Sequence, residues 1–367
     1  MTIDNSDCVW QRTQRITSDF SSQLIAWQQV HGRHTLPWQN TQDPYRVWLS
    51  EIMLQQTQVV TVLAYYEKFL ERFPTVTDLA NASQDEVLTL WAGLGYYSRA
   101  RNLHRCAQDV RDRFAGQFPS HAEDLETLSG IGRSTAAAIA SFCFGEKVAI
   151  LDGNVKRVLT RVLAFDGDMA SNKEVNRLWE HATALLPDHS MPAYTQGMMD
   201  LGATVCITRN PHCLICPVNN LCVAQKEGSP ERYPVKTRKL VRKSKSSWFL
   251  QLVIGGQILL VKRPQTGVWA GLMSLPEFES EQALSAWIEE LAGQQQTLVH
   301  QPVVKHALTH FDWFLQPVQW KTRSVTIDGA ELRRMEARWV SLDQLDQVGL
   351  PAPFKKMLSG FEPSRSQ

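Results

Sequence analysis

The sequence lacks a long apolar run and a positively charged apolar leader, and it has almost no net charge. No stretch approaches the roughly 20 apolar residues that a helix needs to span a bilayer, so we expect a cytoplasmic protein without a membrane partner. With 38 basic and 37 acidic side chains, the formal charge is only +1. A polyanionic partner would therefore have to be held by local asymmetry of charge, and composition alone neither supports nor excludes nucleic acid.

Cysteine is also scarce, and four of the seven cysteines fall in one short segment. Six, two and five residues separate Cys206, Cys213, Cys216 and Cys222. Thiolates this close in sequence can converge on one metal centre, whereas a disulfide would strain the turn between Cys213 and Cys216. The spacing leaves an iron–sulfur cluster and a zinc ion open as alternatives.

The chain is long for a single core, since domains average roughly 150 residues, and we predict two domains. Apolar residues recur every three or four positions up to about residue 224, which predicts an almost entirely helical domain over residues 1–227. Glycine, proline and a basic run then predict an interdomain linker over residues 228–247. Beyond the linker the pattern changes to strands, and we predict an α+β domain over residues 248–367.

Within this second domain, the sequence predicts strands at 248–254 and 257–262, joined by a hairpin turn at Gly255-Gly256 that needs positive backbone angles. Further strands are expected around Val303, 313–320, Val325 and Trp339. Helices are expected at 281–291 and 353–358.

One helix of the first domain is predicted to begin at Asp43-Pro44. An Asp cap accepts a hydrogen bond from a free backbone amide, and Pro in the first helical position loses no needed bond. If the helix continues, Glu51, Gln55 and Gln58 share one polar stripe, because steps of four and three stay on one face. We expect that stripe to line a cleft.

Two further motifs are weak when taken singly. The Gly130-Ile131-Gly132 turn feeds a helix rich in alanine, and such a turn either joins packed helices or offers backbone amides to a phosphate. Asp152 follows an apolar stretch at the start of another helix. It is either a helix cap that stabilises by about 0.5 to 2 kcal/mol or a chemical group, and these two roles are compatible.

Taken together, Gly130-Ile131-Gly132, Asp152 and the cysteine loop, in this order and spacing, resemble the endonuclease III superfamily of DNA glycosylases. The resemblance implies a helix-hairpin-helix element at about residues 123–145. It also implies a structural or DNA-sensing [4Fe-4S] cluster in loop 206–222, held by Cys206, Cys213, Cys216 and Cys222, in preference to zinc.

Four other segments resemble the adenine DNA glycosylases, the MutY family: 36–38, 48–58, 93–101 and 199–202. The resemblance implies a monofunctional DNA glycosylase of base excision repair, acting on double-stranded DNA with adenine opposite 8-oxoguanine or guanine. Superfamily members that also cut the strand carry a lysine where this chain has Ser134, so water is the expected final nucleophile. Such a protein is expected to be a monomer in the bacterial cytosol, associated with the nucleoid through DNA. A pyrimidine or mismatched-thymine glycosylase and a non-enzymatic iron–sulfur DNA-binding protein are the alternatives.

Glycosidic bond chemistry assigns roles to two carboxyl groups. Glu51, desolvated in a base pocket, is expected to protonate adenine N7 and then activate water. Asp152 is expected to stay ionised. The resemblance implies that it stabilises the oxocarbenium-like sugar, directly or through a transient covalent adduct, with Asn154 and Ser134 assisting. The alternative for Glu51 is an exposed surface glutamate.

The family motifs also imply DNA contacts. Tyr96 and Gln56 are expected to wedge into the duplex, while Trp38 and Gln196 line the adenine pocket. Core packing is the alternative for the aromatic residues. The other implied substrate or DNA contacts are Leu54, Gln55, Thr57, Leu94, Gly130, Gly132 and Lys156.

The C-terminal domain resembles a Nudix-type fold, on the basis of segment 267–272 and Leu275-Pro276. It lacks the clustered Arg and Glu residues of Nudix hydrolases, so the resemblance implies recognition of 8-oxoguanine and no phosphohydrolysis. The Phe-Ser-His loop of the family corresponds here to Leu308-Thr309-His310, which keeps the hydroxyl and the imidazole and loses the aromatic ring.

Overall fold

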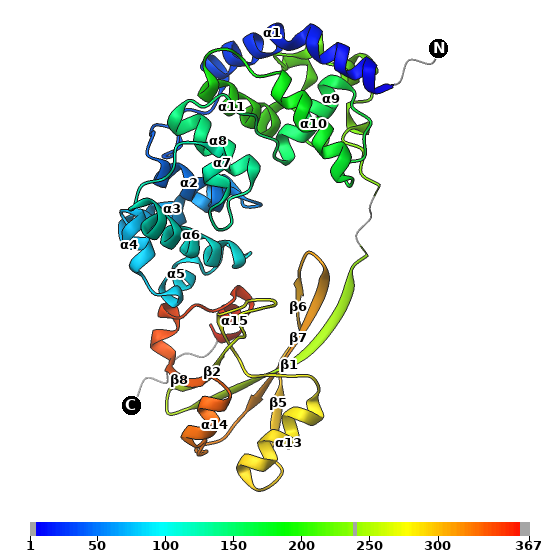
Figure 1. Cartoon of the computed structure of the whole chain (residues 1–367). Helices are drawn as coiled ribbons and strands as arrows, with labels where there is room; N and C mark the ends of the chain where they lie inside the picture. The colour runs from blue at the N-terminus through cyan, green and yellow to red at the C-terminus, as the bar shows by residue number, and fades with distance from the viewer. Residues whose placement is uncertain (1–4, 238–240, 360–367) are drawn as a thin grey trace. The chain divides into compact units, whose positions relative to one another are not determined.

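The computed structural model describes residues 5–237 and 241–359, and the chain divides into two compact units (Figure 1). The helical unit is made of the described residues within Met1–Tyr66, Thr75–Ala80 and Arg105–Lys239. The mixed unit is made of those within Glu67–Pro74, Asn81–His104 and Leu240–Gln367. Among the residues described, no helix has both the length and the apolarity needed to cross a membrane.

The predicted helical character of the first part of the chain is confirmed. Its main helices are α1 (Asn5–His31), α2 (Pro44–Leu54), α3 (Val59–Arg72), α4 (Val76–Asn81), α5 (Gln84–Trp91), α6 (Ser98–Phe114), α7 (Ala122–Glu126), α8 (Arg133–Phe144), α9 (Gly153–Leu163), α10 (Asn172–Ala184), α11 (Met191–Asp200) and α12 (Val223–Lys226). Short helical turns occur at η1 (Leu201–Val205), η2 (Cys213–Ile215), η3 (Asn219–Leu221) and η4 (Pro230–Arg232).

Small side chains let the central helices of the helical unit approach closely. Helix α8 carries a buried run of alanines and packs against α2, α7 and α11. Phe20 and Leu24 of α1 join Val155 and Leu159 of α9 in one apolar core. Burial of these side chains stabilises the bundle and fixes the ends of α2, α8, α9 and α11 relative to one another.

Helix α2 begins as predicted but ends earlier than the polar stripe requires. The Asp43 side chain accepts a hydrogen bond from the Tyr45 amide at 2.9 Å, and Pro44 is the first helical residue. The helix ends at Leu54, and Gln56 has a positive φ of 57°. A turn in which the Thr57 amide donates to the Leu54 carbonyl at 3.2 Å separates α2 from α3. The prediction of one continuous helical stripe through Gln58 was therefore wrong.

The mixed unit has an eight-stranded sheet. Its strands are β1 (Lys243–Ile254), β2 (Gln257–Lys262), β3 (Met273–Ser274), β4 (Glu277–Phe278), β5 (Leu298–His300), β6 (Val304–Ala307), β7 (Phe311–Trp320) and β8 (Ala337–Ser341). The main path runs β3-β2-β1-β7-β5, with β4 on β1, β6 on β7 and β8 on β2. The helical elements of this part are α13 (Glu281–Ala292), α14 (Gly329–Arg334), η5 (Leu342–Gln347) and α15 (Ala352–Leu358).

The predicted hairpin of the mixed unit is confirmed. Strands β1 and β2 pair antiparallel with Ile254 opposite Gln257, and Gly255 and Gly256 both have positive φ. Glycine suits this turn because it has no Cβ to clash in the left-handed region. Strand β1 also pairs in parallel with β7 over its whole register from Lys243 to Leu252, so the two longest strands form the centre of the sheet.

Two expectations for this part were wrong. The linker predicted over 228–247 ends sooner, since residues 243–247 belong to β1; its residues 238–240 lie outside the described residues. The polar residues 243–247 did not show the pattern of a strand in the sequence. They can form one because their side chains have partners in the sheet; Ser247, for example, is buried and donates to Glu277 at 2.7 Å. Val325 lies in no strand, and α14 follows it, capped by Asp328, whose side chain accepts from the Glu331 amide.

Candidate active site

A cavity of about 620 Å³ in the helical unit brings together residues that are far apart in sequence. It is lined by the four predicted catalytic side chains, Glu51, Ser134, Asp152 and Asn154. The predicted contacts Trp38, Leu54, Gln55, Thr57 and Gln196 also line it. The two carboxyl groups therefore share one cavity, as their expected roles require.

Glu51 is on α2 and is half-buried in this cavity. Burial, together with the negative charge of Asp152, raises the pKa of its carboxyl group to about 7. A carboxyl with such a pKa keeps its proton in a large fraction of molecules near neutral pH, which a general acid needs. The alternative of an exposed surface glutamate does not describe this position.

Asp152 is both a helix cap and a cavity residue. Its carboxylate accepts a hydrogen bond from the Val155 amide at 2.7 Å at the start of α9. Burial raises its pKa, while backbone hydrogen bonds and the charges of Arg157 and Lys156 oppose that change. The capping amides and nearby cations favour the ionised form, so the two carboxyl groups have different electrostatic environments.

Ser134 fixes the loop that carries Asp152. Its hydroxyl oxygen, in the first turn of α8, accepts a hydrogen bond from the Leu151 amide at 3.0 Å. Before it, Gly130 has a φ of 78° and Gly132 caps α8 without a side-chain hydrogen bond. This turn between α7 and α8 leaves the first backbone amides of α8 without a capping side chain.

Asn154 is held by a guanidinium group that also contacts the cysteine segment. Arg157 donates to the Asn154 Oδ1 at 2.8 Å, to the Gly202 carbonyl at 2.6 Å and to the Cys206 carbonyl at 2.8 Å. Gly202 lies in η1, a π-helical turn that extends α11. Arg157 thus ties the first turn of α9 to the start of the cysteine loop.

The four predicted ligand cysteines line one small cavity of about 20 Å³. Arg161 donates to the Cys206 sulfur at 3.4 Å and to the Ile207 and Thr208 carbonyls at 2.7 and 3.0 Å. Within residues 5–237 and 241–359, no three His, Cys, Asp or Glu side chains converge closely enough for a single metal ion. An all-cysteine set of four can hold either a zinc ion or an iron–sulfur cluster.

The other predicted contacts of the helical unit vary in exposure. Trp38 is buried and packs edge-on against Tyr66, with ring centroids 5.2 Å apart. Gln56 is exposed, and Lys156 is half-buried on α9. Trp38 therefore packs in the core, which was the alternative to its predicted pocket role, and it also forms part of the cavity wall.

In the mixed unit, Tyr96 and the 308–310 loop meet. Tyr96 has a φ of 47° and is 47% exposed, and its hydroxyl lies 3.4 Å from the Thr309 hydroxyl. Both residues and His310 line one hollow of about 440 Å³. Leu94 is buried, and Tyr97 is buried as its packing alternative predicted.

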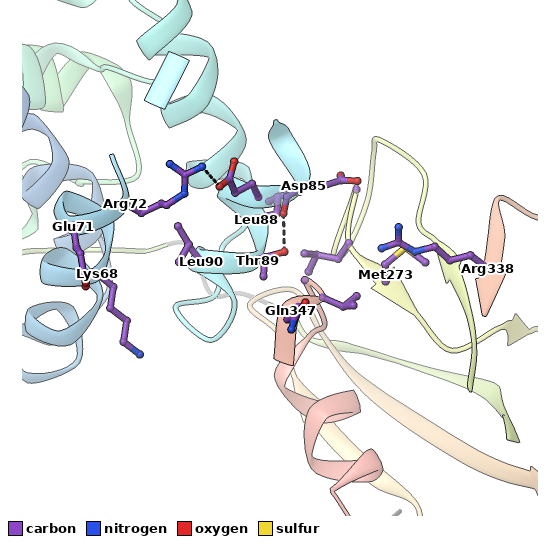
Figure 2. A pocket seen from close by; sticks show the side chains of 15 residues that line it. Lys68, Glu71, Arg72, Asp85, Leu88, Thr89, Leu90, Met273, Arg338 and Gln347 are labelled. Atoms are coloured by element: carbon purple, nitrogen blue, oxygen red, sulfur yellow. Dashed lines mark hydrogen bonds and ion pairs between the residues drawn. The ribbon is translucent and has the colours of Figure 1, made fainter. Parts of the chain in front are cut away.

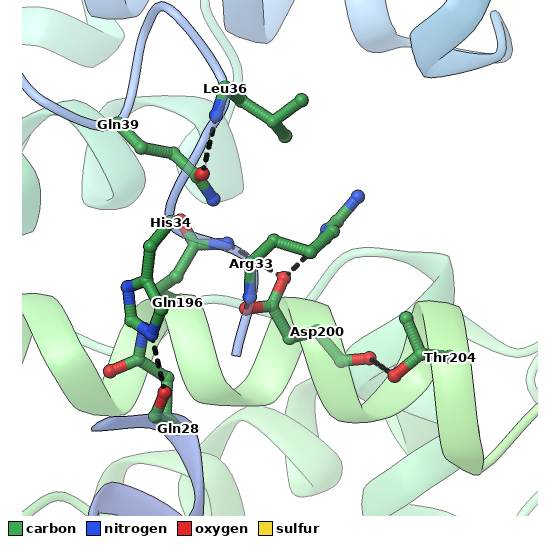
Figure 3. Close-up of polar contacts among 8 residues, drawn as sticks. All are labelled: Gln28, Arg33, His34, Leu36, Gln39, Gln196, Asp200 and Thr204. Atoms are coloured by element: carbon green, nitrogen blue, oxygen red, sulfur yellow. Dashed lines mark hydrogen bonds and ion pairs between the residues drawn. The ribbon is translucent and has the colours of Figure 1, made fainter. Parts of the chain in front are cut away.

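The sequence reasoning missed a polar network behind the cavity (Figure 3). Asp200 is 1% exposed and accepts from the Arg33 amide at 2.9 Å, the Arg33 Nε at 2.7 Å and the Gln196 Nε2 at 2.8 Å. These donors offset much of the desolvation penalty that burial of an unpaired carboxylate would carry. The available signal was the isolated acidic residue in the otherwise apolar segment 198–202.

The mixed unit contains a larger hollow of about 720 Å³, lined by residues such as Lys68, Asp85 and Arg338 (Figure 2). Two of its carboxylates are engaged in ion pairs: Glu86 pairs with Arg72, and Asp85 pairs with Lys262 at 2.8 Å. None of the predicted catalytic residues lines this hollow. The smaller cavity around Glu51 is therefore the candidate active site.

We expect Gly202→Ala to lower the free energy of unfolding by about 1 to 3 kcal/mol, as for other overpacked cores. An added Cβ would lie 2.6 Å from the Asn154 Cβ and 3.3 Å from the Asn154 backbone. Gly153→Ala is the matched control, because its Cβ would meet no atom within 4 Å. Urea unfolding followed by tryptophan fluorescence compares the two variants, and equal stability would contradict the close approach.

Comparison with known families supports the two-part architecture. Residues 49–183 match the HhH-GPD superfamily of base excision DNA repair proteins, and residues 248–360 match the NUDIX domain. A thermostable thymine-DNA glycosylase is 28% identical with a TM-score of 0.52, covering 59% of this chain and 99% of that one. Endonuclease III in a non-covalent DNA complex shares the fold at 19% identity and a TM-score of 0.50, covering 59% of this chain and 97% of that one. The predicted helix-hairpin-helix glycosylase fold followed by a Nudix-like α+β part is confirmed.

Relatives that match almost the whole chain are adenine DNA glycosylases. The adenine DNA glycosylase of Buchnera aphidicola subsp. Acyrthosiphon pisum is 36% identical over 343 residues, which cover 94% of this chain and 97% of the relative. The Homo sapiens adenine DNA glycosylase is 32% identical, and the match covers 94% of this chain and 74% of the relative. The chain therefore belongs to the adenine DNA glycosylase family, and it is a hydrolase of base excision repair that excises adenine from DNA.

Proposed function

We propose that this enzyme is monofunctional and hydrolyses the N-glycosidic bond of adenine paired with 8-oxoguanine or guanine, with Glu51 as the acid and Asp152 as the charge stabiliser. The observation that carries the proposal is the shared cavity, in which Glu51 has a pKa near neutrality and Asp152 is held by helix amides. Two carboxyl groups with such different environments are the minimal equipment for glycoside cleavage.

The steps follow from the charges involved. Glu51 gives its proton to adenine N7, so the electron pair of the breaking C1′–N9 bond leaves on a neutral base. The Asp152 carboxylate compensates the positive charge that grows on the sugar. Water then adds to C1′ and loses its proton to the Glu51 carboxylate, which restores the acid. Ser134 positions the Asp152 loop through the Leu151 amide, and Asn154 lies next to Asp152 in the same cavity.

The DNA-contact assignments remain proposals. Extrusion of the base is cheapest at a mismatch and leaves a gap that Tyr96 and Gln56 are proposed to fill, since both are exposed. Gly130, Gly132 and Lys156 are proposed to hold phosphates. Leu54, Gln55, Thr57 and Leu94 are proposed to shape the pocket and its rim, and Thr309 and His310 to contact 8-oxoguanine.

The remaining proposals concern cofactor, assembly and domains. We propose a structural [4Fe-4S] cluster on Cys206, Cys213, Cys216 and Cys222, supported by their common cavity and by their spacing in the sequence. A monomer acting on nucleoid DNA in the bacterial cytosol stays a prediction, as do the domain limits 1–227 and 248–367. The alternative of a thymine glycosylase rests on a likeness that covers only 59% of the chain, whereas adenine-specific relatives cover 94%.

We expect Glu51→Gln to reduce adenine release from an 8-oxoguanine:adenine duplex by about a hundredfold to ten-thousandfold, because the amide cannot donate a catalytic proton. Duplex affinity should change little. Glu67→Gln, at an exposed position outside the cavity, is the matched control. Full single-turnover activity in the Glu51 variant would refute the acid assignment.

The pH dependence of base release should have two limbs. Above a pH of about 7 the rate falls about tenfold per pH unit, because Glu51 loses its proton. At lower pH it falls again as Asp152, whose pKa burial raises, becomes protonated. In Glu51→Gln the alkaline limb should disappear, and its persistence would mean that another group donates the proton.

We expect no covalent enzyme–DNA adduct on borohydride treatment, because Ser134 offers no amine for a Schiff base. Endonuclease III, for which a trapped covalent DNA intermediate is known, is the positive control. The duplex should be cut only after alkali. Efficient trapping of this enzyme would contradict a monofunctional mechanism.

Purified enzyme should contain about four iron and four sulfide ions per chain, as one [4Fe-4S] cluster requires. Cys216→Ser should lose most of this iron and unfold at lower temperature. Cys8→Ser, an exposed cysteine outside the loop, is the control that should retain it. Stoichiometric zinc without iron would overturn the cluster assignment.

A further inference from the structure

The turn that carries Thr309 and His310 is tight, but its own residues do not fix its conformation. Strands β6 and β7 pair antiparallel, and beyond their last pair the Leu308 amide donates to the Phe311 carbonyl at 3.0 Å. Thr309 and His310 are therefore the two central residues of a hairpin. Hairpin turns of this length favour a positive φ, which glycine and asparagine adopt most easily, and neither of these two residues has one. Contacts from outside the hairpin must therefore hold the turn.

Those contacts come from two consecutive residues at the start of β1. Arg242 lies in the basic run that the sequence placed in the linker, and Lys243 is the first residue of β1. The Arg242 guanidinium donates to the Leu308 carbonyl at 3.0 Å, just before the two central residues. The Lys243 amide donates to the His310 carbonyl at 3.3 Å. One side chain and one backbone amide thus hold the carbonyls on both sides of Thr309.

A carboxylate fixes the Arg242 side chain against the turn. Asp312 of β7 forms an ion pair with Arg242 and accepts from the Lys305 Nζ at 2.8 Å. The same Arg242 nitrogen, Nη2, donates to the Asp312 carboxylate and to the Leu308 carbonyl. This nitrogen carries two hydrogens, so it can serve both acceptors at once. The ion pair with Asp312 therefore places the donor that the turn carbonyl needs.

We propose that Arg242 is a positioning residue that holds the turn of Thr309 and His310, and that it thereby sets the preference of the enzyme for 8-oxoguanine over guanine opposite the adenine. The inference rests on the proposed function in one respect, the contact of these two turn residues with 8-oxoguanine. Guanine accepts a hydrogen bond at N7, whereas 8-oxoguanine donates there and carries an oxygen at C8. Discrimination between the two bases depends on the accurate placement of a few polar groups, and a released turn would place them less accurately.

Adenine release from 8-oxoguanine:adenine and guanine:adenine duplexes, at enzyme concentrations below saturation, tests the inference. The ratio of the two rates measures the preference and cancels differences in the amount of folded enzyme. We expect Arg242→Met to lower this ratio about threefold to tenfold, as for loss of one hydrogen bond. An unchanged ratio would overturn the inference.

Lys243→Met is the matched control for Arg242→Met. It removes the same charge from the neighbouring exposed position, but it keeps the backbone amide that bonds the His310 carbonyl. Loss of one positive charge weakens attraction to any duplex, so this variant should slow release from both duplexes equally. A ratio lowered as much by Lys243→Met as by Arg242→Met would overturn the role of the Arg242 side chain.

Opposite changes of charge separate positioning from general attraction to DNA. Arg242→Met removes a positive charge, whereas Asp312→Ala removes a negative charge and with it the ion pair that holds Arg242. Charge alone would shift the affinity for both duplexes in opposite directions in these variants and leave the ratio of rates unchanged. The positioning role predicts that both variants lower the ratio. A wild-type ratio in both, with affinities shifted in opposite directions, would refute it.

The outcome is separable from that of the proposed function. A double variant, Thr309→Ala with His310→Ala, tests the reading role itself, and a wild-type ratio of rates in this variant would refute that role. The hold of Arg242 on the turn would still be decided by hydrogen exchange at the Leu308 amide of the full chain, measured by mass spectrometry. Faster exchange in Arg242→Met than in Lys243→Met supports it, and equal exchange in the two variants would overturn it.

Discussion

The proposed chemistry of this enzyme depends on a difference between two carboxyl groups in one cavity. Glu51 comes from the middle of α2, where no backbone amide is free, and burial together with the Asp152 charge favours its neutral form. Asp152 comes from the start of α9, where the Val155 amide and nearby cations favour its charged form. Helix position therefore decides which carboxyl group holds the proton.

The packing of the helices holds the Glu51 and Asp152 carboxyl groups in their different environments. Small alanine side chains on α8 allow close packing with α2 and α11, and the Ser134 hydroxyl ties the start of α8 to Leu151. On the far side of α9, Arg157 binds Asn154 and the backbone of Cys206 with one guanidinium. A planar group with several donors suits this task, because it holds three partners in one fixed geometry. Order in the cysteine loop and order at the catalytic turn are thus linked by direct contacts.

Sequence patterns predicted the features that depend on local chemistry. The Asp43 cap, the Gly255-Gly256 hairpin and the Asp152 cap each follow from a residue's own backbone preference. The errors concern features that depend on partners elsewhere. The start of β1 read as linker because Ser247 meets Glu277 only in the folded sheet.

The candidate site shows the same limit. Glu51, Asp152 and the cysteines were identified by motif spacing, but no local pattern shows that Gln39 or Arg33 lies at the same cavity. The hydrogen bonds from Arg33 to Asp200 connect residues 167 positions apart, so they arise from tertiary packing. The bond from Gln196 to Asp200 is local to α11, but no sequence pattern shows that it lies at the cavity. The continuous stripe through Gln58 failed for a related reason, since the turn at Gln56 ends α2 while leaving Gln55 and Gln58 at the same cavity.

The backbone at the two proposed wedge residues supports a prepared DNA-binding surface. Gln56 and Tyr96 both have positive φ without being glycine, a conformation that costs about 1 to 3 kcal/mol and persists only when neighbours enforce it. Around Tyr96 the enforcing contacts are visible: the Arg99 amide donates to the Tyr96 carbonyl at 2.8 Å, and the Trp91 indole donates to the Gly95 carbonyl at 3.1 Å. In the proposed wedge role, a backbone that is already fixed by such contacts has little conformational freedom left to lose when the enzyme binds a duplex.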